Sequence, residues 1–150
     1  MSRRLAREVV LQSLFQIDFN ECEADSALMS AIAEHDEFAC LEDIPEGEEP
    51  SAKVVSCLKA KNYAECVLNG VLANVADIDD KLSQFAVDWT VERMPATDRN
   101  ILRIAIYEML YAEEKIVPGV AINEAVEIAV TPVTRPSSTI RFSASVRSST

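Results

Sequence analysis

The chain has 150 residues and a mass of 16.5 kDa, which suits one domain with a substantial core. Hydrophobic residues make up 49% and there are only three glycines, a composition typical of a compact helical protein rather than a sheet-rich one. The net charge of −11 disfavours non-specific nucleic-acid binding, so any such binding must use a local basic patch.

The first half of the chain predicts two helices and then a loop. Residues 3–20 carry apolar side chains at three- and four-residue spacing, and Ser2 is the expected N-cap. A second helix begins at Asp25 or Ser26, and its apolar stripe is Leu28, Met29, Ile32 and Ala33. The segment "LEDIPEGEEP" (41–50) holds two prolines, one glycine and five acids, which indicates a loop.

The second half predicts further helices. Ser51 is expected to cap a long helix that runs to about Val75, and a short helix follows from Asp77. Pro95 and Pro118 each suit the first turn of another helix, the first covering 96–114 and the second 119–130. No alternating strand pattern competes with these segments, so the predicted fold class is all-α.

The helix after Pro95 is expected to lie at the centre of a bundle, because apolar residues cover most of its circumference. Its predicted inner face consists of Leu102, Ala105, Ile106, Met109 and Leu110. Arg103 interrupts it, and no carboxylate stands three or four residues away on the same helix. Glu124 and an external phosphate are the two candidate partners of this arginine.

No catalytic or metal-binding arrangement is found, so we expect a protein that is not an enzyme and uses no cofactor. His35 stands in an acidic region and is interpreted as a surface residue, and the adjacent pair Asp79–Asp80 as solvated carboxylates. The cysteines have no CxxC spacing and share one histidine, so they are interpreted as reduced, mostly buried thiols: Cys22, Cys40, Cys57 and Cys66.

Targeting signals are also missing from the sequence. The longest uncharged run has eleven residues (66–76), well below the roughly 18 that a membrane-spanning helix needs. The arginines at the N-terminus are not followed by the continuous apolar stretch of a signal peptide. We therefore expect a cytoplasmic location.

The distribution of charge is informative. Residues 20–50 contain eleven acids and no Lys or Arg, whereas Arg3, Arg4 and Arg7 stand together at the start of the first helix. Cations weaken a helix N-terminus, so an external anion would explain their position. Their spacing allows all three to share one face, and Gln12 further along could read a base edge. Single-stranded RNA suits such a patch, and a merely solubilising terminus is the alternative.

Four stretches in order resemble the family of the transcription antitermination factor NusB. They are "RRLAREVVLQSLFQIDF", "NGVLANVADIDDKL", "DWTVERMPATDRNILRIAIYEML" and "VPGVAINEAVEIA", which together span most of residues 3–129. The resemblance implies two small helical bundles packed together. It also implies binding of boxA-type RNA with the ribosomal protein NusE, and antitermination of ribosomal RNA transcription by RNA polymerase.

The resemblance also implies roles for individual residues. Arg3, Arg4 and Arg7 match the arginine-rich RNA-contacting terminus of the family, and Gln12 and Arg103 match further positions near the RNA. Phe15 and Asp98 match positions that face NusE. For Arg103, a structural pairing with Glu124 remains an equal alternative.

The tail departs from the family, which ends in a further helix. Ten of the last twenty residues are Ser or Thr, so residues 131–150 are expected to be an irregular tail behind a 1–130 helical domain. A legal choice of codons for Thr131 to Val146, read in another frame, gives "AGDEAVKYNTVLGKR", close to the missing ending. We therefore predict a frameshift, which the gene sequence can test.

Two rival functions remain open. One is the NusB-like RNA-binding domain that precedes a methyltransferase in some ribosomal RNA-modifying enzymes; the absence of a cofactor-binding domain counts against it. The other is a helical interaction module that binds no RNA. The salt dependence of RNA binding distinguishes the second rival from an RNA-binding protein, because phosphate contacts release counterions.

Overall fold

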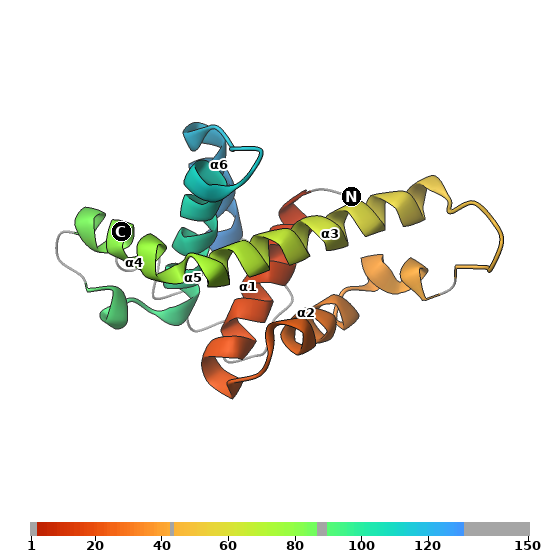
Figure 1. Cartoon of the computed structure of the whole chain (residues 1–150), viewed down its shortest axis with the longest axis horizontal. Coiled ribbons are helices and arrows are strands. Elements are labelled where there is room, and N and C mark those ends of the chain that lie inside the picture. The colour runs from red at the N-terminus through yellow and green to blue at the C-terminus, as the bar shows by residue number, and fades with distance from the viewer. Residues whose placement is uncertain (1–2, 43, 87–89, 131–150) are drawn as a thin grey trace. The chain divides into compact units, whose positions relative to one another are not determined.

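A computed structural model describes residues 3–42, 44–86 and 90–130 (Figure 1). These residues form helices and turns without any strand, which confirms the all-α fold class. The chain divides into two compact units, Met1–Leu68 and Asn69–Thr150, and the boundary falls inside the long helix α3 (Ala52–Ala73).

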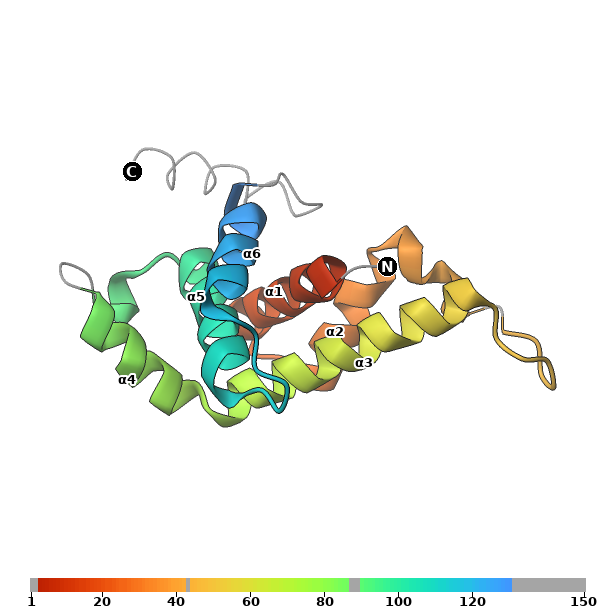
Figure 2. The ribbon, with the colours of Figure 1, turned by 90° about the horizontal axis from the view of Figure 1, so that it is seen from above.

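The first unit is built on α1 (Arg3–Asn20) and α2 (Ala24–Ala33), which pack against each other across a short connection (Figures 1 and 2). A 3-10 helix, η1 (Asp36–Leu41), follows, and then the first turns of α3. The core contains small and branched side chains from these elements: Ala6, Val9, Val10, Leu14, Ala27, Leu28, Ala31, Ile32 and Phe38. The predicted periodicity of α1 is therefore confirmed.

The apolar stripe predicted for α2 is only half right. Leu28 and Ile32 are buried, but Met29 is 57% exposed, and Ala27 and Ala31 fill the inner face instead. Residues one and four apart in this helix share the buried face, which turns position 29 outward. Small side chains at 27 and 31 allow α2 to approach α1 closely.

The second unit contains the end of α3 and the following helices. These are α4 (Val75–Phe85), η2 (Val91–Arg93), α5 (Ala96–Ile106), the π-helical turn η3 (Tyr107–Tyr111) and α6 (Pro118–Val130). Helix α5 packs against both α4 and α6. Figure 2 shows α5 and α6 side by side. This agrees with the predicted central position of α5.

The inner face of α5 agrees with the prediction only in part. Ala105 and Ile106 are buried as predicted, and Ile101 and Ile104 are buried as well. Leu102 is 38% and Leu110 48% exposed. The predicted helix over 96–114 changes at Tyr107 into a π-helical turn, which places an extra residue in the turn and rotates the following side chains. Leu110 thereby leaves the face on which the α-helical period would have placed it.

Gly70 permits a close contact inside the second unit. A Cβ atom at this position would overlap the ring of Tyr107, which is buried against this part of α3. A residue with a Cβ atom therefore does not fit at position 70 while the Tyr107 ring occupies this place.

The sequence predicts N-caps for two helices, Ser2 for the first and Ser51 for the long helix α3. Ser51 Oγ accepts a hydrogen bond from the Val54 N–H at 3.3 Å, which confirms Ser51 as a cap of α3. Ser2 and the tail over 131–150 lie outside the described residues.

No helix in the part of the chain that the structure describes has the length and apolar character needed to cross a membrane.

Candidate nucleic-acid interface

The three N-terminal arginines differ in exposure. Arg3 is exposed, Arg4 is half-buried and Arg7 is only 4% exposed. Arg7 follows Ala6 and precedes Val10 by one turn, so it falls on the face of α1 that packs inward. The expectation of one shared surface is therefore wrong for Arg7, and the accessible positive charge comes from Arg3 and Arg4.

Arg3 lies over the ring of Tyr63, a residue of α3. The guanidinium carbon is 4.8 Å from the ring centroid, a cation–π contact that connects the first turn of α1 with α3. Tyr63 was not among the predicted site residues, because 60 residues separate it from Arg3 and only the tertiary fold brings the two together.

An acidic side chain stands beside this basic start of α1. Burial raises the pKa of the Glu8 carboxyl above its ordinary value, while the charges of His35 and Arg4 act in the opposite direction. Glu8 thus partly offsets the charge of Arg4.

Gln12 is already bound within the protein. Its Oε1 atom accepts a hydrogen bond from Nε2 of His35 at 2.9 Å. His35 is 6% exposed and also packs edge-on against Phe38, so the interpretation of this histidine as a surface residue was wrong. Because η1 begins directly after His35, the Gln12–His35 bond holds η1 against the middle of α1.

Arg103 is paired with Asp79, which was not among its predicted partners. Its Nε and Nη2 atoms donate to the two carboxylate oxygens of Asp79 at 2.8 and 2.7 Å, and Nη1 donates to Asn100 Oδ1 at 3.0 Å. The predicted pairing with Glu124 is therefore wrong, and so is the interpretation of Asp79 as a solvated carboxylate. The two-pronged ion pair joins α4 to α5.

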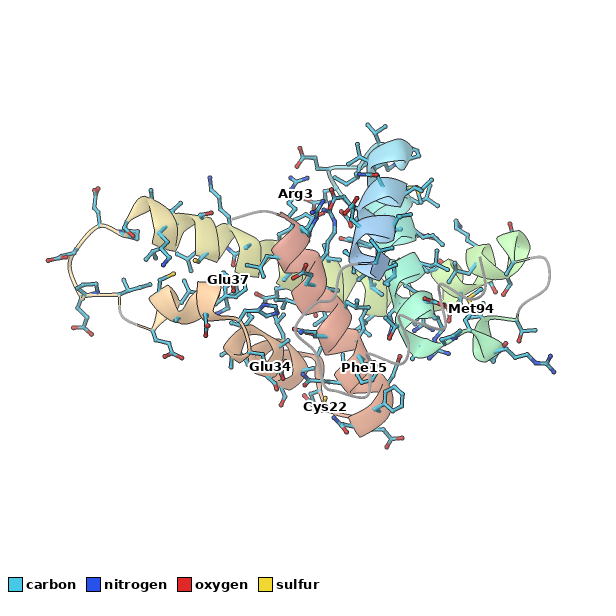
Figure 3. All side chains as sticks on the ribbon, turned by 180° about the vertical axis from the view of Figure 1, so that it is seen from behind. Arg3, Phe15, Cys22, Glu34, Glu37 and Met94 are labelled. Carbon is cyan, nitrogen blue, oxygen red and sulfur yellow. The ribbon has the colours of Figure 1, made fainter. Side chains whose placement is uncertain are left out.

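The residues expected to face NusE fall in different units. Phe15 stacks on Phe19 with ring centroids 4.5 Å apart, near the end of α1 opposite to Arg3 (Figure 3). Phe19 is 63% exposed and is a second aromatic residue that the sequence analysis did not select. Asp98 is half-buried in the first turn of α5, and burial raises the pKa of its carboxyl.

The thiols are less buried than expected. Cys57 is buried, Cys22 and Cys40 are half-buried, and Cys66 is exposed. Within the described ranges, no three Cys, His, Asp or Glu side chains form a group that could hold a metal ion.

Comparison with known proteins identifies the family. The sequence profile described as the NusB family matches residues 4–139. This chain belongs to the NusB family. A transcription antitermination protein NusB from Geobacter sp. (strain M21) is 37% identical over 128 residues, which cover 85% of this chain and 80% of that protein. A protein of the same name from Desulfitobacterium hafniense (strain DCB-2) is 42% identical over 131 residues, 86% of this chain and 75% of that protein.

A solved structure supports the same assignment. NusB from T. maritima aligns with a TM-score of 0.64 and 30% identity, over 90% of this chain and 81% of that one. Family membership confirms the resemblance found in residues 3–129. It also supports the expectation that this chain is not an enzyme, because the relatives are transcription antitermination proteins.

Within this NusB fold the candidate residues form two groups. Arg3, Arg4, Arg7 and Gln12 belong to α1 in the first unit, and Arg103 belongs to α5 in the second. In the first group, Arg3 and Arg4 have guanidinium groups at the accessible start of a helix. That arrangement can bind phosphate oxygens, which are the acceptors that arginine matches best.

Proposed function

We propose that this chain is an RNA-binding transcription antitermination factor. In this proposal it binds boxA-type single-stranded RNA together with NusE and promotes antitermination of ribosomal RNA transcription. The observation that carries the proposal is the exposed Arg3, with Arg4 beside it, at the first turn of α1 in a NusB-family chain. The whole chain has a net charge of −11, and cations at a helix N-terminus are unfavourable for the helix. Binding of a polyanion would explain why arginines stand at this position.

Arg3 and Tyr63 together offer more than charge. Single-stranded RNA is held through its phosphates and through bases that stack on aromatic or guanidinium planes. Arg3 is held over the Tyr63 ring, and Lys59 is exposed one turn before Tyr63 on α3. We expect Arg3 and Arg4 to bind phosphate, with Tyr63 and Lys59 extending the same surface.

The other candidate RNA-binding residues already make contacts within the protein, and these contacts fix the positions of their side chains. Gln12 is held by His35, and Arg103 by Asp79 and Asn100, so both side chains are fixed before RNA arrives. A guanidinium has five N–H donors, and the three bonds of Arg103 leave donors for a phosphate at the edge of its 12% exposed side chain. Arg7, which is buried, would contribute positive charge from beneath the surface.

For NusE we propose contact with the aromatic pair Phe15 and Phe19. An exposed aromatic ring supported by a second ring gives a large apolar contact at low entropic cost. Asp98 is proposed to approach the same partner from the second unit. The RNA polymerase antitermination complex would then be reached through NusE and the RNA.

The deciding experiment is a paired titration followed by fluorescence anisotropy. A boxA-type RNA and a scrambled RNA are titrated, in the presence of NusE, with this chain and with a version that carries the shifted-frame tail. We expect at least one of the two proteins to bind the boxA-type RNA more tightly than the scrambled RNA. If neither protein discriminates, the antitermination proposal fails and the interaction-module alternative replaces it.

Mutations locate the RNA surface. Arg3→Ala and Arg4→Ala should each weaken binding and reduce the dependence of log K on log salt by about 0.7 per lost phosphate contact. Arg93→Ala is the matched control, because this arginine is also exposed but lies in η2 of the other unit. A double Arg3/Arg4 variant that binds with unchanged affinity and salt slope would show that the helix start is not the binding site.

A further inference from the structure

Two thiols from separate elements lie in direct contact in the first unit. Cys40 belongs to η1 and Cys57 to the second turn of α3, on either side of the acidic segment 41–50. Their Sγ atoms are 2.9 Å apart. The carbonyl oxygen of Glu37 accepts from both thiols, at 3.1 Å from Cys57 Sγ and 3.6 Å from Cys40 Sγ.

The separation of the two sulfur atoms is close to that in a disulfide. An S–S bond is about 2.05 Å long, so the two sulfur atoms need to approach by less than about 1 Å. Cys40 is in the last turn of η1, next to a loop, which can supply so small a movement without displacing a long helix. The shared carbonyl holds both thiols on the same side of the η1 backbone.

The two thiols differ in accessibility. Cys57 is fully buried, whereas Cys40 is half-buried at the surface. Burial, followed by the hydrogen bond with Cys40, raises the pKa of Cys57 to about 11. The Cys57 thiol therefore stays protonated near neutral pH, and an oxidant arriving from solvent meets Cys40 first.

We propose that Cys40 and Cys57 form an oxidative modification site that takes a hydroperoxide as oxidant and closes to an intramolecular disulfide. The Cys40 thiolate attacks the terminal peroxide oxygen and the O–O bond breaks, giving a sulfenic acid on Cys40. Hydroxide leaves from hydrogen peroxide, and an alkoxide leaves from an organic hydroperoxide. Cys57 Sγ then attacks Cys40 Sγ, the S–O bond breaks, and the Cys57 proton leaves with the hydroxyl as water. One peroxide is reduced by two electrons while two thiols become a disulfide.

The product would tie η1 to α3 and enclose the acidic segment between them. Such a cross-link restricts the unfolded chain and prevents η1 from separating from α3. In a reducing compartment the site would remain in its dithiol form and close only under oxidative stress. Disulfide formation does not depend on the proposed RNA binding, because it is measured on the protein alone, although Cys57 shares α3 with Tyr63 and Lys59 of the proposed RNA surface.

The test uses the full chain with Cys22→Ser and Cys66→Ser, which leaves only the two cysteines of interest. The protein is treated with hydrogen peroxide, alkylated under denaturing conditions and digested with trypsin. We expect a peptide of residues 54–59 disulfide-linked to the peptide that holds Cys40, a mass lower by two hydrogens, and a Tm raised by several degrees. Dithiothreitol should reverse all three changes.

Single variants in the same background are the controls. Cys57→Ser should accumulate a sulfenic acid on Cys40 that dimedone traps, and Cys40→Ser should leave Cys57 unmodified with no shift in Tm. Recovery of two alkylated thiols, over-oxidation of Cys40 beside an intact Cys57 thiol, or intermolecular cross-links through Cys40 would each overturn the proposal. If Cys57→Ser does not fold, the Cys40→Ser protein still gives the comparison.

Discussion

At the scale of single residues, Arg103 shows how a half-buried charge is satisfied. Its two-pronged bond to Asp79 and its bond to Asn100 compensate the desolvation of the guanidinium, whose side chain is only 12% exposed. Removing one partner of such a pair leaves the other charge desolvated and unpaired, so the loss exceeds the net contribution of the pair.

We predict that Asp79→Ala lowers the free energy of unfolding by about 1–3 kcal/mol, because the Arg103 guanidinium loses two hydrogen bonds to a carboxylate. Asp80→Ala is the control: it removes the neighbouring exposed carboxylate and should change stability by less than about 0.5 kcal/mol. Urea unfolding measures both. Equal effects of the two variants would mean that the ion pair contributes nothing specific.

Asp98 gives a prediction for pH. Burial raises the pKa of its carboxyl above the ordinary value of 3.8, so folding favours the protonated form. The stability that this group contributes is therefore present below pH 3.8 and lost as the pH rises through the raised folded value. Asp98→Asn keeps a neutral side chain at every pH. Its advantage in unfolding free energy over the parent should grow as the pH rises above 3.8.

Chemical unfolding of both proteins at a series of pH values measures this difference. A gap between them that stays constant with pH would contradict the prediction. The same variants separate stability from function, since a loss of NusE binding in Asp98→Asn at unchanged stability would support the proposed partner contact.

At the scale of elements, contact between helices decides what a sequence position tolerates. In an ordinary helix interior, alanine is more favourable than glycine by roughly 0.5–1 kcal/mol. Gly70 is an exception because the Tyr107 ring occupies the space where a Cβ would stand. Gly119 in α6 has open space around the same position.

We therefore predict opposite signs for two chemically identical substitutions. Gly70→Ala should destabilise the protein by about 1–3 kcal/mol through overpacking against Tyr107, despite the gain in helix propensity. Gly119→Ala should be neutral or stabilising by up to about 1 kcal/mol. Thermal unfolding compares the two. Stabilisation by both would show that the Tyr107 ring moves away without loss of stability.

At the scale of the whole molecule, α6 retains an apolar stripe on its exposed surface. Ile122, Val126 and Val130 recur every four residues and are 55%, 54% and 48% exposed. The match covers 80% and 75% of the lengths of the relatives from Geobacter and Desulfitobacterium, so a part of each relative has no counterpart in it. Burial of such apolar surface would stabilise the protein by about 25 cal/mol per Å², and this stabilisation is absent while the stripe is exposed.

We predict that replacing the tail after Val130 with "AGDEAVKYNTVLGKR" raises the Tm and lowers binding of a dye that reports exposed apolar surface. The inserted segment should form a helix that covers the stripe. A tail with the same residues in scrambled order is the control for composition. Ile122→Ser should then destabilise the version with the restored tail more than the present chain. Equal Tm values for the restored and scrambled tails would contradict this account.

The sequence by itself determined the all-α fold class, most of the helix positions and the family. Helix positions follow from local periodicity, prolines and caps, and the family from motifs that are continuous in sequence, so both were predictable without a fold. Which face of each helix is buried was less certain: the π-helical turn after Ile106 moved Leu110 outward, and no local signal announces such a turn.

Only the tertiary structure decided the partners of polar side chains. Asp79 for Arg103, His35 for Gln12, Tyr63 for Arg3 and Cys40 for Cys57 are all separated by many residues in the sequence. Such pairs depend on how helices pack, and a difference of one residue in a helix changes the direction of a side chain by about 100°. For the same reason, Arg7 was expected on the surface with Arg3 and is buried instead.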